Sequence, residues 1–296
     1  MRDAPIRQRF KEPHALRDFG VRTFTALVMA AILVGADLWG GMLACAAVVA
    51  VVAALCAVEL YGLMRTDHGR PNAVFGVLAV AAMPIAAALY AGGVMPGSGP
   101  TSSELGAVGL TAVTGGLVLA ALAWQMAFKQ VSVSNTATTV FGALYAGFTL
   151  SHLVLMRALD SGAELVIITI VGVWAMDVLA YLVGSAIGTH RMAPHISPKK
   201  SWEGFAAGTV GTIAVWVAGW RITGSPLPLW WFALIGVAAA VAALVGDLAE
   251  STLKREFGAK DSGTLLPGHG GFLDRFDSMI VVAIVVYYML LFGGAR

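Results

Sequence analysis

The part of this sequence best equipped for chemistry is one polar stretch, residues 251–277, which reads STLKREFGAKDSGTLLPGHGGFLDRFD. Apolar segments flank it on both sides, and charge beside hydrocarbon is expensive enough that membrane proteins usually keep it for a use. Basic groups, carboxylates and a Gly-His-Gly-Gly bend together suit phosphates bridged by a divalent cation. The candidate side chains and backbone positions are Lys254, Arg255, Lys260, Asp261, His269, Gly270, Gly271, Asp274, Arg275 and Asp277.

Three aspartates are the candidate metal ligands. Asp274 and Asp277 are spaced i, i+3 at the start of the last apolar run, and Asp247 stands near the end of the preceding run. Carboxylate oxygens are the ligands that Mg²⁺ prefers. The alternative is helix capping, because aspartate at a helix N-terminus is favoured without any catalytic role. Two such aspartates, together with Asp247, are more than capping alone requires.

A charged helical face follows Asp247. If that helix continues beyond the membrane surface, Glu250 or Ser251 and then Lys254 lie on the same face at i+3 or i+4 and i+7. The face offers an acid that can hold a metal and a cation that can meet a phosphate. The alternative is a set of intrahelical ion pairs, each worth a few tenths of a kcal/mol.

The glycine-rich bend offers backbone donors. Gly270 and Gly271 allow N–H groups to approach an anion closely. His269 could donate to a phosphate, although a single loop histidine is more often simply solvated.

Asp177 is an acid inside an apolar run, with Tyr181 and Gly184 on the same helical face at i+4 and i+7. A carboxylate at that depth should face a polar cavity or a basic partner. It either lines a substrate cavity or pairs with another helix to hold the two together.

A basic pair precedes the next apolar run in the string SPKKSWEG, residues 197–204. Lys199 and Lys200 could bind the phosphate of a lipid or a nucleotide, and the alternative is the positive charge expected of a cytoplasmic loop. Ser197 or Ser201 could cap the helix that follows.

Composition indicates a membrane protein. The 296 residues are 58% hydrophobic and only 12% charged, whereas ordinary domains carry about 25% charged residues. A net charge of +2 is too small to indicate a nucleic-acid partner. Apolar runs long enough to cross a bilayer predict an all-α polytopic protein with about nine transmembrane helices. These runs are 23–40, 42–62, 73–94, 105–126, 136–156, 165–185, 204–220, 229–247 and 278–293.

The basic residues predict the orientation. With the N-terminus in the cytoplasm, 16 of the 19 Lys and Arg residues lie on the cytoplasmic side, as the positive-inside rule requires. Three parts are predicted: a basic segment 1–22, a transmembrane scaffold 23–160, and a catalytic half 161–296 with cytoplasmic loops 186–203 and 248–277. Glu59, near the inner end of the second run, is interpreted as a snorkelling interfacial residue.

Residues 251–277 closely resemble the signature of the phosphatidate cytidylyltransferases, or CDP-diacylglycerol synthases. The segment 197–204 and Asp177 with Tyr181 and Gly184 are also similar to motifs of that family. The resemblance in motifs runs from Asp177 to the end of the chain. Upstream it is limited to hydropathy and the number of spans.

The resemblance implies that CTP and phosphatidic acid are condensed to CDP-diacylglycerol and pyrophosphate. It implies Mg²⁺, with K⁺ as a second cation, on Asp247, Asp274 and Asp277. Catalytic roles are then expected for Lys254, Arg255, Lys260, Asp261, His269 and Arg275. Substrate contacts are expected for Asp177, Ser197, Lys199, Lys200, Ser251, Gly270 and Gly271. The expected location is a bacterial inner membrane, with the active site facing the cytoplasm.

Two other classes remain open from the residues. A transporter could use Asp177 as an intramembrane coupling site, although the ionisable groups gather on one face instead of tracing a path across. Another membrane phosphotransferase is the second alternative, but the D-G-x2-A-R and G-x4-G-K-[ST] patterns are both missing. Small-residue spacings such as Gly184/Gly188 and Gly204/Gly208 permit tight helix packing, either within one chain or in a homodimer.

Overall fold

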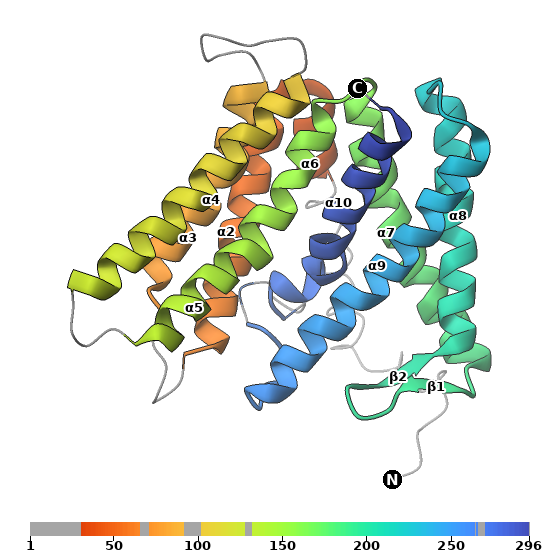
Figure 1. The fold of residues 1–296 in the computed structure, drawn as a ribbon. Helices are drawn as coiled ribbons and strands as arrows, with labels where there is room; N and C mark the ends of the chain where they lie inside the picture. The colour runs from red at the N-terminus through yellow and green to blue at the C-terminus, as the bar shows by residue number, and fades with distance from the viewer. Residues whose placement is uncertain are drawn as a thin grey trace.

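The computed structural model describes residues 31–65, 71–91, 102–127, 132–263, 265 and 270–295, and this part of the chain is almost entirely helical (Figure 1). Residues 31–39 are helical and precede the first labelled helix. The labelled elements are α2 (Gly41–Leu63), α3 (Ala73–Ala91), α4 (Ser102–Ala127), α5 (Val133–Gly142), η2 (Ala143–Phe148), α6 (Thr149–Arg157), α7 (Gly162–Ile187), β1 (Arg191–Ala193), β2 (Ser197–Ser201), α8 (Trp202–Thr223), α9 (Leu229–Glu256) and α10 (Leu273–Gly293).

The predicted all-α membrane architecture is confirmed. Within the described residues, eight helical stretches are long and apolar enough to cross a membrane, with α5, η2 and α6 forming one of them. These eight coincide with eight of the nine predicted runs. The first predicted run, 23–40, lies mostly outside the described residues.

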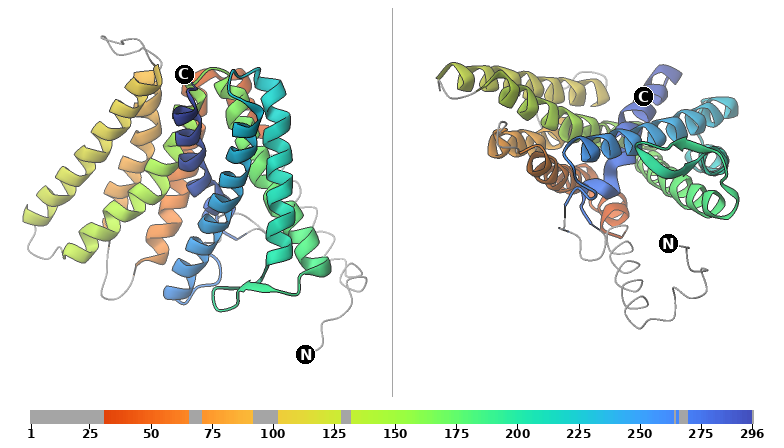
Figure 2. Two further views of the ribbon diagram at one scale, coloured as in Figure 1. Left: turned by 45° about the vertical axis from the view of Figure 1, so that its right-hand side comes forward. Right: turned by 90° about the horizontal axis from the view of Figure 1, so that it is seen from below.

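One helix connects two groups of helices. The helices from α2 to α6 gather on one side, α7, α8 and α9 on the other, and α10 lies between them (Figures 1 and 2). Helix α10 packs against α9 and α7 of the second group and against α6 and α2 of the first. Helix α10 is therefore packed against elements from both halves of the chain.

The predicted loop 186–203 contains a small antiparallel hairpin, in which β1 pairs with β2. The hairpin leads directly into α8, where the Ser201 hydroxyl accepts a hydrogen bond from the Gly204 N–H at 3.2 Å. Of the two predicted capping serines, Ser201 is the cap, and Ser197 lies in β2. The cap defines where α8 begins, directly after the strand that carries Lys199 and Lys200.

Glycines bring α7 and α8 close together within one chain. A Cβ added to Gly204 would lie 2.6 Å from the Ala180 carbonyl oxygen and 3.2 Å from the Gly184 Cα. A Cβ on Gly208 would lie 2.5 Å from the Met176 sulfur. The predicted small-residue packing thus occurs between neighbouring helices of the same subunit.

Gly204→Ala should therefore destabilise the protein. The new methyl group meets backbone of α7 that cannot move aside, and overpacking of this kind costs about 1–3 kcal/mol. Thermal unfolding in detergent should show a lower midpoint. The matched control is Gly115→Ala in α4, where an added Cβ has no heavy atom within 4 Å. Equal midpoints for the two variants would contradict the close packing.

Candidate functional site

A cavity of about 650 Å³ lies where the C-terminal ends of α7 and α9 and the N-terminal end of α10 meet the hairpin and the start of α8. The polar side chains predicted for the site that line it are Asp177, Lys199, Lys200, Asp247, Asp274, Arg275 and Asp277. Apolar residues, among them Met176, Tyr181 and Phe205, complete the wall. The fold thus gathers candidate residues from four separate elements into one hollow.

Asp247 and Lys200 form an ion pair across this cavity. The Lys200 Nζ lies 2.6 Å from Asp247 Oδ2, and both side chains are partly exposed. The Ser251 hydroxyl, one turn further along α9, donates to Asp247 Oδ1 at 3.3 Å. Ser251 therefore orients a carboxylate of the cavity without lining the cavity itself.

Asp277 lies one turn into α10. Its Oδ1 accepts a hydrogen bond of 2.6 Å from the adjacent Ser278 N–H. The Ser278 hydroxyl in turn donates to the Ala243 carbonyl oxygen of α9 at 3.2 Å. This contact joins α9 and α10 directly beneath the two aspartates Asp247 and Asp277.

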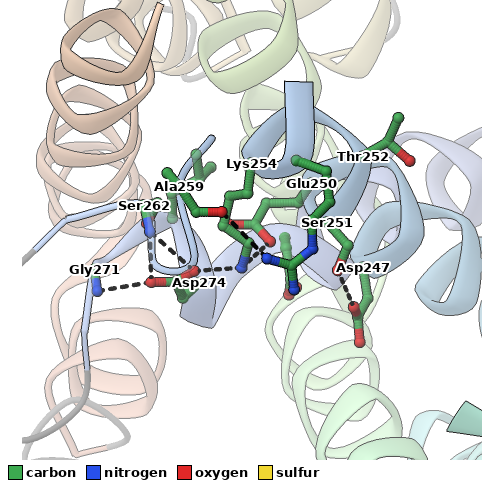
Figure 3. A network of polar contacts seen from close by, with 12 residues as sticks. Asp247, Glu250, Ser251, Thr252, Lys254, Ala259, Ser262, Gly271 and Asp274 are labelled. Carbon is green, nitrogen blue, oxygen red and sulfur yellow. Dashed lines mark hydrogen bonds and ion pairs between the residues drawn. The ribbon is translucent and has the colours of Figure 1, made fainter. Parts of the chain in front are cut away.

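Asp274 is held by protein donors on both of its oxygens (Figure 3). Oδ1 accepts from the Lys254 ammonium at 2.7 Å. Oδ2 accepts from the backbone N–H of Gly271 at 2.8 Å and of Ser262 at 3.1 Å. These contacts satisfy donors at and before the start of α10, which is the stabilising role that an acid at a helix N-terminus can have.

Lys254 connects two carboxylates from two helices. Its Nζ lies 2.5 Å from Glu250 Oε2, one turn back on α9, and 2.7 Å from Asp274 Oδ1 on α10. The side chains of Glu250, Asp274 and Lys254 are 1%, 10% and 13% exposed. The intrahelical pair that the sequence left open is present, and it is extended by an interhelical one.

Several other predicted residues in the part of the chain described here do not line the cavity. Arg255, Lys260 and Asp261 are exposed, and the Arg255 guanidinium donates to the Ala259 carbonyl oxygen at 3.3 Å. Gly270 has φ +81°, a conformation that favours glycine. His269 lies outside the described residues.

The interpretation of Glu59 as a snorkelling residue is wrong. Its side chain is buried in α2, 5% exposed, and Oε2 accepts hydrogen bonds from the Leu273 N–H at 2.9 Å and the Ser262 hydroxyl at 3.2 Å. The available signal was an ionisable residue within a spanning helix, which should have a specific partner. That partner lies 214 residues away in the sequence, so no local pattern identifies it.

The carboxylates of the cavity fit a cation bound together with substrate. Among the described side chains, no group of three or more His, Cys, Asp and Glu residues is arranged to hold a metal ion alone. Asp247 and Asp277 nevertheless line the same cavity with oxygen ligands. Mg²⁺ commonly binds through one or two carboxylates together with substrate phosphates and water. This donor set fits that mode of binding.

Comparison with known proteins identifies the family of the chain. A family profile described as "Cytidylyltransferase family" matches residues 20–292 of the chain.

Several individual relatives are named phosphatidate cytidylyltransferase. A phosphatidate cytidylyltransferase of Mycobacterium bovis is 37% identical over 200 residues, which are 62% of this chain and 65% of the relative. The corresponding protein of Bacillus subtilis is 38% identical over 54% of this chain and 62% of its own length. The phosphatidate cytidylyltransferase of Brucella abortus is 40% identical over 52% of this chain and 56% of its own length. The chain thus spans less than two thirds of each of these relatives.

Lys254→Met should destabilise the protein strongly. It leaves Glu250 and Asp274 buried without their cation, and breaking one side of a buried pair costs about 3–5 kcal/mol. Thermal or denaturant unfolding measures the effect, with Lys260→Met, at an exposed position, as the matched control. A Lys254→Met protein as stable as the control would show that the ion pairs do not hold α9 to α10.

Proposed function

The chain belongs to the cytidylyltransferase family, and on that premise we propose that it transfers the cytidylyl group of CTP to phosphatidic acid. The products are CDP-diacylglycerol and pyrophosphate. The observation that carries the proposal is that one cavity, at the ends of α7, α9 and α10, is lined by both acidic and basic side chains. Such a cavity suits two polyanions that must meet with their charges neutralised.

The reaction is an in-line displacement. A phosphate oxygen of phosphatidic acid forms a bond with the α-phosphorus of CTP, and the bond from that phosphorus to the oxygen bridging the β-phosphate breaks. Pyrophosphate leaves with the bonding electrons. A phosphate monoester is largely ionised near neutral pH, so the attack needs no general base, and positioning and charge stabilisation dominate the catalysis.

Asp247 and Asp277 are the proposed cation ligands. Mg²⁺ bound there would neutralise phosphate oxygens and help align the attacking and leaving groups. K⁺ as a second cation belongs to the same proposal. Asp274, the third predicted ligand, could take this role only by releasing Lys254 or the N–H groups that its oxygens now accept from.

Basic side chains of the cavity would bind the phosphates. We assign Lys199 and Lys200 to the phosphate of the lipid and Arg275 to the leaving pyrophosphate, because all three line the cavity. Lys200 already contacts Asp247 at 2.6 Å, so it would link the lipid phosphate to a cation ligand. Lys254 acts through Asp274, by the ion pair that joins the two helices.

The membrane location follows from the lipid substrate. The diacyl chains would remain in the bilayer beside the apolar wall that includes Met176, Tyr181 and Phe205. The positive-inside distribution supports a cytoplasmic site in a bacterial inner membrane. Asp177 lines the same cavity as the other acids, which supports a role at this site over a separate transport path. A homodimer remains a prediction.

The central test is Asp277→Asn in purified protein supplied with CTP, Mg²⁺ and phosphatidic acid. Formation of CDP-lipid and pyrophosphate should fall by about 100-fold or more, as expected when a charge-stabilising group is lost. The matched control is Asp160→Asn, at an exposed position remote from the cavity, which should keep the wild-type rate. A wild-type protein that forms no CDP-lipid contradicts the proposed function, and an active Asp277→Asn protein excludes Asp277 as a ligand.

Lys200→Gln should weaken the use of phosphatidic acid more than the use of CTP. Loss of one charge-assisted contact with the lipid phosphate should raise the KM for phosphatidic acid about tenfold. Steady-state kinetics in mixed micelles, with each substrate varied in turn, measures both constants. A larger increase in the KM for CTP would assign Lys200 to the nucleotide instead.

A further inference from the structure

Glu59 links the N-terminal helices to the first turn of α10. It is buried near the inner end of α2, and one of its oxygens accepts from both the Leu273 N–H and the Ser262 hydroxyl. We propose that Glu59 is a positioning residue, which holds the start of α10 so that Asp277 projects into the cavity. For its catalytic consequence this inference rests on the proposed function.

Two carboxylates hold the same turn from different helices. Asp274 accepts from the backbone N–H groups of Ser262 and Gly271, while Glu59 accepts from the Ser262 hydroxyl and the Leu273 N–H. Asp274 thus joins Ser262 to Gly271, which belongs to the glycine-rich bend. Glu59 joins Ser262 to Leu273 and connects both residues to α2.

The glycines beside Glu59 leave the space that its carboxylate occupies. A Cβ added to Gly263 would lie 2.4 Å from Glu59 Oε1, and one added to Gly271 would lie 2.4 Å from Glu59 Oε2. The Gly271 Cβ would also lie 2.1 Å from the Ser262 hydroxyl oxygen. Glycine at these two positions is thus explained by the contact with Glu59.

The chemistry of the contact favours a carboxylate. The first N–H groups of a helix have no partner within the helix, and they carry the positive end of its dipole. A carboxylate accepting from such a group forms a strong, charge-assisted hydrogen bond. Because α10 is a continuous helix from Leu273 onward, fixing its first residue also fixes Asp277, about one turn later.

The test compares Glu59→Ala, Glu59→Gln and Ser262→Ala with Glu164→Gln, a matched control at an exposed acid that begins α7. Hydrogen exchange of peptides covering residues 262–273 reports on the contact without depending on the reaction. Exchange should be about tenfold faster or more in Glu59→Ala, because hydrogen bonds to a charged group are lost. It should be less affected in Glu59→Gln, whose amide oxygen can still accept, and unchanged in Glu164→Gln.

Kinetics separates positioning from general stability. In Glu59→Ala, kcat should fall about tenfold or more with a smaller change in the KM for CTP, because the displaced group acts in the transition state. Adding Ser262→Ala to Glu59→Ala should cause little further loss, since the hydroxyl has already lost its acceptor. Glu164→Gln should keep the wild-type kcat.

The contact of Glu59 and its positioning role are two parts of the inference, and each can be overturned separately. Wild-type exchange at 262–273 in Glu59→Ala overturns the contact, and faster exchange with wild-type kcat overturns the positioning role. If Glu59→Ala does not fold, Glu59→Gln and Ser262→Ala must still show faster exchange, and their wild-type exchange overturns the inference. A wild-type protein that forms no CDP-lipid refutes the proposed function, and the exchange measurements then decide the contact with Glu59 by themselves.

Discussion

The arrangement of the cavity depends on one buried ammonium group that two carboxylates share. Glu250 and Lys254 stand one turn apart on α9, and Lys254 reaches Asp274 at the start of α10. Removing the ammonium would leave two acids of low exposure without their cation, and breaking a buried ion pair in this way is costly. The ion pairs therefore act as a geometric constraint, because they bring the C-terminal part of α9 to the start of α10. Asp247 and Asp277, on the same parts of these helices, line one cavity.

The start of α10 is held from a second direction as well. Lys254 contacts it from α9, in the C-terminal half, and Glu59 contacts it from α2, in the N-terminal half. The apolar N-terminal helices thus do more than fill the membrane, because α2 supplies a hydrogen-bond acceptor, Glu59, for the backbone at the start of α10. Apolar packing is non-directional, whereas a carboxylate bonded to a particular N–H specifies both distance and direction.

Local patterns predicted the local features of the site. The i, i+3 spacing of Asp274 and Asp277 placed both at the start of one helix, and the apolar runs gave eight of the spans within the described residues. The sequence offered two roles for Asp274, cation binding and helix stabilisation, but not the contacts that its oxygens make. Its bond to Lys254 joins residues 20 apart, and the bonds of Glu59 join residues more than 200 apart. Such pairings arise from tertiary packing, and no periodicity encodes them.

The first turn of α10 shows how one local preference can serve both the fold and the chemistry. A helix N-terminus favours acids because its N–H groups are unsatisfied and its dipole is positive there. Asp274, the nearer acid, satisfies backbone donors and pairs with Lys254, so its charge stabilises the structure. Asp277, one turn later, accepts only the adjacent Ser278 N–H among the hydrogen bonds found for it in the described structure. Asp274, whose oxygens are already bonded, fixes the start of the helix. Asp277 has fewer hydrogen bonds to its oxygens in the described structure, and it is the acid of this helix for which we propose cation binding.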